Sequence, residues 1–117
     1  MPALEKGMIN MIRALIIKAN GEYFVRDIVK GYKAVNEIVC GDSEYVTLTT
    51  GLSLACNEMG KANHLPVNER ATAVYKAYLN TCDWIAGDAV IYGLDAMGDS
   101  CSLSEDQISE IEKNMEG

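Results

Sequence analysis

A short apolar run near the start of the chain constrains the fold most. Residues 11–17 are apolar except for Arg13 and rich in branched side chains, which predicts a buried strand. The dipeptide Asn20-Gly21 follows, and Asn-Gly is the strongest short signal for a β-hairpin. Residues 23–28 then alternate in a way that is typical of a return strand. The fold is therefore expected to begin with an antiparallel hairpin.

Apolar residues at helical spacing predict three helices further along the chain. The first covers residues 32–39, and Gly41 stands where a left-handed residue would end it. The second begins after Asn68, a favourable N-cap, and continues to about residue 80. The third begins after Ser104, which opens an S-x-x-Q capping box. Its apolar stripe is thin, so it either docks lightly or serves a partner.

The remaining strand signals complete the pattern. Residues 45–48 and 52–56 predict a second hairpin, and residues 84–92 predict a last strand. Within that strand, Gly87-Asp88 indicates a bulge or a close approach of another segment. This order predicts an α+β fold: a single small domain with a mostly antiparallel sheet of about five strands. Two helices are expected to cover one face of it, and an acidic helix to follow at the C-terminus.

The length of 117 residues suits one domain. Met8 and Met11 are alternative start sites, so residues 1–10 are interpreted as an N-terminal extension. Residues 11–103 are then the α+β domain and residues 104–117 the acidic C-terminal helix. The chain has no apolar run of about 18 residues, and its start lacks the order of a signal peptide. We therefore expect an intracellular protein that makes no membrane contact.

The net charge of −7 is unevenly distributed along the chain. Residues 1–80 carry a net charge of +1, whereas residues 81–117 carry −8. The acidic end disfavours direct binding to a nucleic-acid backbone. Basic residues that could bind an anion all lie in the first two-thirds, apart from Lys113.

Metal and nucleophile signals are weak. The four cysteines are far apart in the sequence and form no C-x-x-C pair, and His64 is the single histidine. Zinc sites need closely spaced ligands, so no metal is expected, and the thiols are interpreted as free and buried. A nucleophilic pair of His64 with Cys56 stays open, but no local signature supports it. We expect no cofactor and no catalytic residues.

Four aspartates near the C-terminal third could form a hydrolase site or bind a divalent cation. They are Asp83, Asp88, Asp95 and Asp99. The D-x-D-x-D-G pattern of a calcium loop is absent, which favours a simple turn after the last strand.

Three blocks of sequence carry a family resemblance. They are N-E-x-G-K at residues 57–61, L-P-x-N-x-x-A-T at residues 65–72 and G-D-A-V-I-x-G at residues 87–93. With the hairpin start, they resemble the domain-of-unknown-function family 3846 over about residues 11–103. The resemblance implies a protein common in bacteriophages and mobile elements, and it brings no established catalytic residues. The segment before Met11 and the acidic C-terminal helix lie outside the pattern.

The same blocks suggest a ligand site. A glycine turn with Lys61 leads to the helix that begins after Asn68, and helix N-termini favour phosphates. The predicted ligand-binding residues are Asn57, Lys61, Asn68, Arg70, Thr72, Trp84 and Asp88. Tyr75, Tyr78 or Tyr92 could also supply an aromatic wall. In the simpler interpretation, Asn68 only caps its helix, Thr72 packs and Arg70 is solvated.

Three functions compete at this level. The first is a non-enzymatic phage or mobile-element accessory protein that counters host defence in the host cytoplasm. It would sequester a small nucleotide signal or inhibit a host defence protein through its acidic third. The second is an acidic mimic of nucleic acid that blocks a DNA-binding enzyme, and the weakest is a small hydrolase. Open sheet edges also predict a homo-oligomer.

Overall fold

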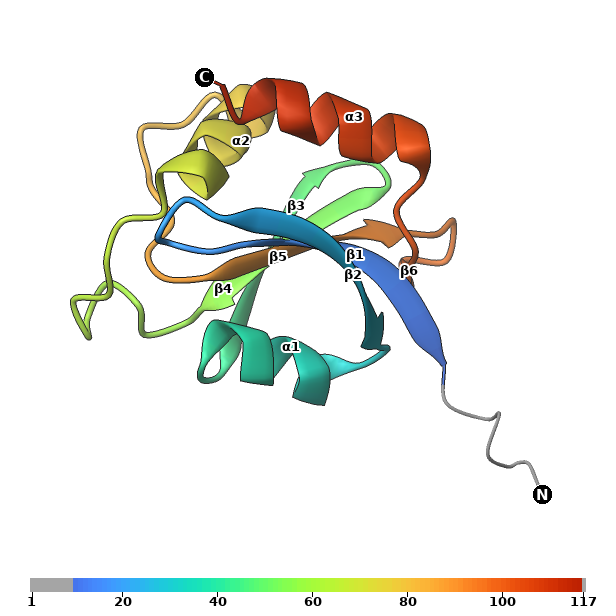
Figure 1. Ribbon diagram of the computed structural model, residues 1–117, viewed down its shortest axis with the longest axis horizontal. Helices are drawn as coiled ribbons and strands as arrows, with labels where there is room; N and C mark the ends of the chain where they lie inside the picture. Colours follow the sequence, from blue (N-terminus) through green and yellow to red (C-terminus); the bar gives the residue numbers. More distant parts are fainter. Residues whose placement is uncertain (1–9, 117) are drawn as a thin grey trace.

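The computed structural model describes residues 10–116 as one α+β domain around a six-stranded sheet (Figure 1). In chain order the elements are β1 (Met11–Ile17), β2 (Tyr23–Val29), α1 (Tyr32–Val39), β3 (Ser43–Thr49), β4 (Leu52–Asn57), α2 (Glu69–Leu79), β5 (Ala89–Leu94), β6 (Ser100–Cys101) and α3 (Glu105–Asn114). The predicted fold class is confirmed. The predicted N-terminal extension lies outside the described residues, except for Asn10.

The sheet is antiparallel throughout and has the strand order β2-β1-β5-β4-β3, with the short β6 beside β5. Both predicted hairpins form, as β1–β2 and β3–β4. β5 comes much later in the chain and lies between them, so that Ile91 pairs with Leu15 on one side and Leu54 on the other. This insertion leaves β2 and β3 as the two edges of the sheet.

Helices cover both faces of the sheet, with α1 on one side and α2 and α3 on the other (Figure 1). The prediction that helices cover one face is therefore wrong. The cause is visible in β1, where Leu15 and Ile17 pack on the α2–α3 side while Ile12 and Ile16 pack on the α1 side. Successive strand residues point to opposite faces, so a strand that is apolar at nearly every position needs a cover on both.

The C-terminal helix α3 docks firmly on the domain. Ser104 and Gln107 form both hydrogen bonds of the predicted capping box. Leu103, Ile111 and Met115 are buried in the core that α2 also covers. The thin apolar stripe therefore anchors the helix to its own chain and leaves its acidic face outward.

The end of α1 differs from its predicted form. Cys40, with φ 64°, is the left-handed residue, and not Gly41. Gly41 is needed for a different reason, because a Cβ atom there would lie 2.8 Å from the side-chain nitrogen of Asn57. The Asn57 amide approaches the backbone at this point to bind the end of the helix.

The last long strand also starts later than predicted. β5 begins at Ala89, so Trp84 lies in the loop before it and not in a strand. Gly87 has φ 84°, and a Cβ atom there would lie 2.8 Å from Leu65 Cδ1. Of the two predicted readings of Gly87-Asp88, the close approach is the one that the structure has. Among residues 10–116, no helix is long and apolar enough to span a bilayer.

Candidate functional site

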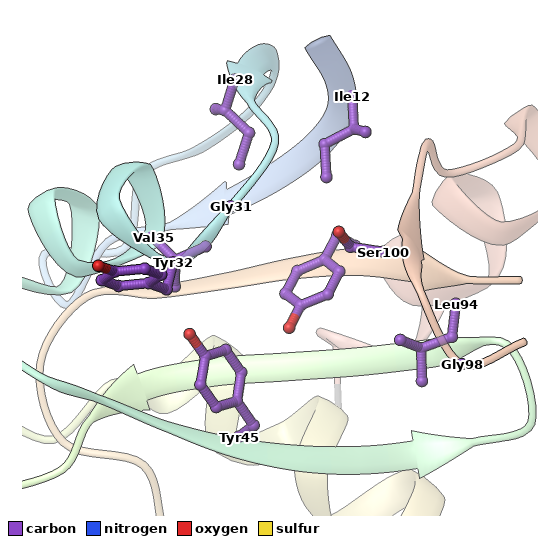
Figure 2. A pocket seen from close by; sticks show the side chains of 10 residues that line it. Ile12, Ile28, Gly31, Tyr32, Val35, Tyr45, Leu94, Gly98 and Ser100 are labelled. Carbon is purple, nitrogen blue, oxygen red and sulfur yellow. The ribbon is translucent and has the colours of Figure 1, made fainter. Parts of the chain in front are cut away.

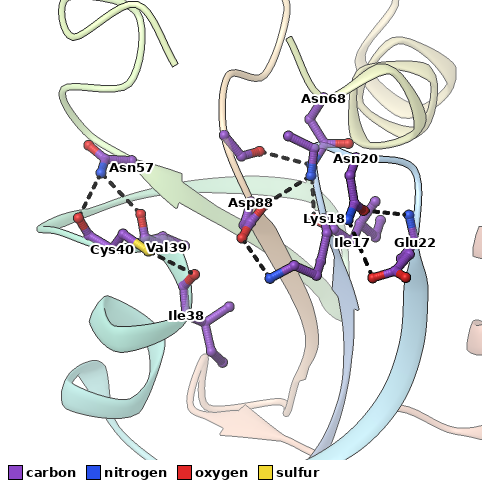
Figure 3. Close-up of polar contacts among 12 residues, drawn as sticks. Ile17, Lys18, Asn20, Glu22, Ile38, Val39, Cys40, Asn57, Asn68 and Asp88 are labelled. Carbon is purple, nitrogen blue, oxygen red and sulfur yellow. Dashed lines mark hydrogen bonds and ion pairs between the residues drawn. The ribbon is translucent and has the colours of Figure 1, made fainter. Parts of the chain in front are cut away.

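Three of the seven predicted ligand-binding residues have their polar side chains directed into the fold. The Asn57 amide nitrogen donates to the carbonyl of Val39 at 3.0 Å and to that of Cys40 at 3.2 Å (Figure 3). Its carbonyl oxygen accepts from the N–H of Met59. Asn57 therefore closes the C-terminal end of α1 and has no group left toward solvent.

The side chains of Asn68 and Thr72 also form hydrogen bonds with backbone groups, on the other side of the sheet. Asn68 is fully buried, and its amide nitrogen donates to the carbonyls of Ile17 and Gly87, each at 2.9 Å (Figure 3). Its side-chain oxygen accepts from the N–H of Ala71, which confirms the predicted N-cap. Thr72 is buried too, and its hydroxyl accepts from the N–H of Ile85 at 2.9 Å.

Lys61 and Trp84 do come together at the surface. The Lys61 ammonium lies 4.3 Å from the centroid of the Trp84 ring and forms an ion pair with Asp83. This hydrogen bond raises the pKa of Lys61 and lowers the pKa of Asp83. The cavity beside them, which Asn57 also lines, has a volume of only about 80 Å³. Small-molecule sites usually measure about 300–1,000 Å³, so no ligand-sized pocket exists at this cluster.

Arg70 and Asp88 lie elsewhere, near the β1–β2 turn. The Arg70 side chain donates to the carbonyl of Gly21 at 2.9 Å and lies 5.3 Å from the centroid of the Tyr23 ring. Asp88 pairs with Lys18 at 3.1 Å and accepts from the N–H of Ala19 (Figure 3). The seven residues are thus distributed over several places and do not line one common cavity. Ligand binding by Lys61, Trp84 or Arg70 stays a prediction.

A different cavity, of about 230 Å³, lies on the α1 side of the sheet. We call it the tyrosine cavity, because Tyr32, Tyr45 and Tyr92 line it. Tyr32 and Tyr45 are 63% and 48% exposed, whereas Tyr92 is only 7% exposed. Figure 2 shows Tyr32 and Tyr45 on opposite ribbons beside the opening, with the Tyr45 hydroxyl directed inward. The remaining lining residues are Ile12, Ile28, Gly31, Val35, Leu94, Gly98 and Ser100.

The fold creates this cavity because α1 is too short to cover its whole face of the sheet. α1 starts at Tyr32, after Gly31 with φ 128°, and has no side-chain N-cap. Tyr45 projects from the edge strand β3, and the turn between β5 and β6 supplies the far wall. An ion pair between Lys30 and Asp99, at 2.8 Å, holds the end of β2 to that turn.

The polar groups of the tyrosine cavity are few, and the described residues that line it include no acidic or basic side chain. Burial raises the pKa of Tyr92, so its phenol stays protonated. The Ser53 hydroxyl donates to the Tyr92 hydroxyl over 3.4 Å, which is beyond the usual range of about 2.5–3.0 Å and makes this a weak hydrogen bond. Tyr92 can therefore turn its hydroxyl toward a bound molecule at little cost. No sequence signal predicts this cavity, since its three tyrosines come from three separate elements.

The nucleophilic pair of Cys56 and His64, which the sequence leaves open, gains no support from the structure. Burial raises the pKa of Cys56 to about 11, so its thiol is a poor nucleophile, and His64 lies exposed in a loop. Contrary to the prediction of buried thiols, Cys40 and Cys82 are exposed and Cys101 is half-buried.

The four aspartates do not gather either. Asp83, Asp88 and Asp99 each pair with a different lysine, and Asp95 accepts N–H groups of its own turn. Within residues 10–116, no three potential metal ligands of the His, Cys, Asp or Glu type come together.

Fold and surface together define a small α+β sheet domain with a small aromatic-lined cavity and, among the described residues, no cluster of three potential metal ligands. The chain belongs to the family described as Domain of unknown function (DUF3846), whose model matches residues 12–116. The match extends through α3, so the acidic helix is part of the family pattern and the predicted limit near Leu103 was too short. No curated protein and no solved structure matches the chain.

Proposed function

We propose that this protein is a non-enzymatic binding protein that sequesters a small nucleotide, with the tyrosine cavity as its binding site. The observation that carries the proposal is the meeting of Tyr32, Tyr45 and Tyr92 at one hollow. Stacking of a base on an aromatic side chain contributes about 1–3 kcal/mol and tolerates any base. Two exposed rings beside a buried third form a place for a planar ring system.

The size of the cavity determines which part of a nucleotide enters. A volume of about 230 Å³ lies below the range of about 300–1,000 Å³ for sites that enclose a whole drug-sized ligand. The base would therefore be enclosed, and the ribose and phosphate would stay at the mouth. There the first turn of α1 has no acidic residue and no side-chain cap, and Lys33 is exposed. The uncapped start of α1 and the exposed Lys33 ammonium both favour a phosphate at the mouth of the cavity.

The biological role that we propose is that of a phage or mobile-element accessory protein acting in the cytoplasm of the host. It would counter host defence by holding a nucleotide signal and thus lowering its free concentration. The small size, the lack of a metal-ligand cluster among the described residues and the phage association that the family resemblance implies support this role. Inhibition of a host defence protein through the acidic face of α3 is the other form of the same role.

The spatial distribution of charge argues for ligand binding over mimicry of nucleic acid. Four acids of the last third form ion pairs with bases of the first part of the chain. The pairs are Asp83–Lys61, Asp88–Lys18, Asp99–Lys30 and Glu105–Arg13. These pairs neutralise part of the acidic last third, and the remaining acids of α3 lie on a helix whose 10 residues span about 15 Å. A mimic of a duplex backbone needs a longer negative face.

Titration calorimetry with mono-, di- and cyclic nucleotides tests the proposal. We expect Tyr32→Ala and Tyr45→Ala each to weaken binding by about 5- to 150-fold, which corresponds to the loss of one stacking contact. Both side chains are exposed, so the variants should keep the thermal midpoint of the free protein.

The control is the double variant Lys61→Ala, Arg70→Ala, which alters the positions favoured by the sequence and leaves the tyrosine cavity intact. We expect it to bind as the wild type does. Loss of binding in this double variant, with full binding in both tyrosine variants, would show that the ligand binds near Lys61 or Arg70. It would refute the proposal that the tyrosine cavity is the binding site.

A further inference from the structure

The edge strand β2 presents an uninterrupted row of backbone groups to solvent. Lys30 donates its N–H to the carbonyl of Asn10, and Lys18 donates its N–H to the carbonyl of Glu22, both at 2.8 Å. These bonds flank the β1–β2 ladder, and bonding alternates along an antiparallel strand. The even-numbered residues of β2 therefore bond to β1. The N–H and C=O groups of Tyr23, Val25, Asp27 and Val29 point outward.

The side chains of β2 are unusually apolar for an exposed edge. Tyr23, Phe24, Val25 and Val29 are each between 36% and 48% exposed, and only Ile28 is buried. The other edge strand, β3, is interrupted by a shift of register between Thr47 and Thr49. A bulge of this kind is a common device that prevents an edge from pairing, and the regular ladder between β1 and β2 contains none.

We propose that β2 is a dimerisation strand, which pairs antiparallel with β2 of a second copy of this chain about a two-fold axis at Val25. Residues that lie directly opposite each other in an antiparallel pair have their side chains on the same face of the sheet. The two-fold axis must therefore pass through a residue that pairs with the same residue of the second copy. An axis at Arg26 would place two guanidinium groups opposite each other, and an axis at Asp27 two carboxylates. Like charges directly opposite destabilise a ladder, which argues against both of these axes. An axis at Phe24 would pair only residues 23–25 of β2 with the second copy, whereas an axis at Val25 pairs residues 23–27.

The strand is complementary to itself in this register. Phe24 of each copy lies opposite Arg26 of the other, in a non-hydrogen-bonded pair where side chains approach closely. An arginine over an aromatic ring is attracted to its face. On the other face Val25 meets Val25, and Tyr23 meets Asp27, where a phenol can donate to a carboxylate. Both charges of the strand, Arg26 and Asp27, thus gain a suitable neighbour, and the outward backbone groups gain hydrogen bonds.

Cysteine cross-linking tests the register directly. In an antiparallel ladder, directly opposed hydrogen-bonded residues have Cα atoms about 5.5 Å apart, within the disulfide range of about 4.4–6.8 Å. Val25→Cys, made in a Cys40→Ser, Cys82→Ser background to remove the exposed native thiols, should give a disulfide-linked dimer under mild oxidation. Thr47→Cys on the other edge is the matched control and should stay monomeric on a non-reducing gel.

Sedimentation equilibrium gives a second measurement without new thiols. The wild-type chain should sediment as a dimer, and Val25→Pro as a folded monomer, because the lost N–H of Val25 makes no bond within its own chain. A monomeric wild type at about 100 μM would overturn the proposal, since even weak specific pairs associate at such concentrations. More efficient cross-linking of Arg26→Cys or Asp27→Cys than of Val25→Cys would overturn it as well.

Discussion

Asn68 is expected to be the most sensitive polar position of the domain. Its buried amide binds two backbone carbonyls, that of Ile17 at the end of β1 and that of Gly87 in the loop before β5, and caps α2 at Ala71. A buried acceptor left without a partner costs about 1–3 kcal/mol, so the two carbonyls account for about 2–6 kcal/mol. Loss of the N-cap adds about 1 kcal/mol. Small domains are stable by only about 5–15 kcal/mol, so Asn68→Ala should bring the chain close to unfolding.

Urea denaturation followed by circular dichroism at 222 nm separates the two contributions. Asn68→Ser keeps an N-cap but loses both carbonyl contacts, so it should cost nearly as much as Asn68→Ala. Ser104→Ala removes the N-cap of α3, a solvent-exposed cap, and should cost only about 1 kcal/mol. If Asn68→Ala and Ser104→Ala lowered the free energy of unfolding equally, the buried carbonyl contacts would contribute nothing and the reasoning would fail.

Two further expectations concern titratable groups. Iodoacetamide at about pH 8 should modify Cys40 and Cys82 well before Cys56, because burial raises the pKa of Cys56 to about 11. Mass spectrometry of samples taken early in the reaction checks this order. Equal rates of modification for the three thiols would contradict it. The ion pair with Lys61 lowers the pKa of Asp83 in the folded state below its usual value of 3.8. The ionised Asp83 therefore stabilises the fold above that pH, and this stabilisation is lost as the pH falls through the folded-state pKa. The thermal midpoint of Lys61→Met should therefore fall less between about pH 6 and about pH 3 than that of the wild type, and equal falls would count against the pair.

The elements that the sequence predicts well are those with local chemical causes. The turn at Asn20-Gly21, the N-cap at Asn68 and the capping box at Ser104 depend on residues within a few positions of each other. Each of them appears in the structure. The helix α1 has a local cause too, because its apolar residues recur at helical spacing. Its left-handed end residue is Cys40 and not the predicted Gly41, whose lack of a side chain makes room for the distant Asn57.

Features that depend on distant pairing could not be predicted. The insertion of β5 between two hairpins decides which strands are central, and central strands are apolar on both faces. Coverage of both faces has a local sign in β1, which is apolar at nearly every position, but the identity of the other central strands follows from the insertion of β5. The two-residue β6 is too short to leave a periodic signal.

The residues of the candidate site were even harder to predict from the sequence than the sheet topology. Asn57, Asn68 and Thr72 stood out because polar residues in a glycine-rich block resemble ligand contacts, yet their side chains bind backbone groups of other elements. Sequence alone does not give the direction in which a polar side chain points. Tyr32 and Tyr45 were ordinary members of a helix and a strand, and only the tertiary structure brings them to one cavity.

A thermal-shift screen of the intact protein against mono-, di- and cyclic nucleotides tests nucleotide sequestration most directly. A ligand present at 100 times its dissociation constant adds about 2.7 kcal/mol of stability, which should raise the midpoint by roughly 10 °C for a domain of this size. We expect such a rise for at least one nucleotide, and its loss when Tyr32 and Tyr45 are both replaced by alanine. A midpoint that no nucleotide raises would contradict the proposed function.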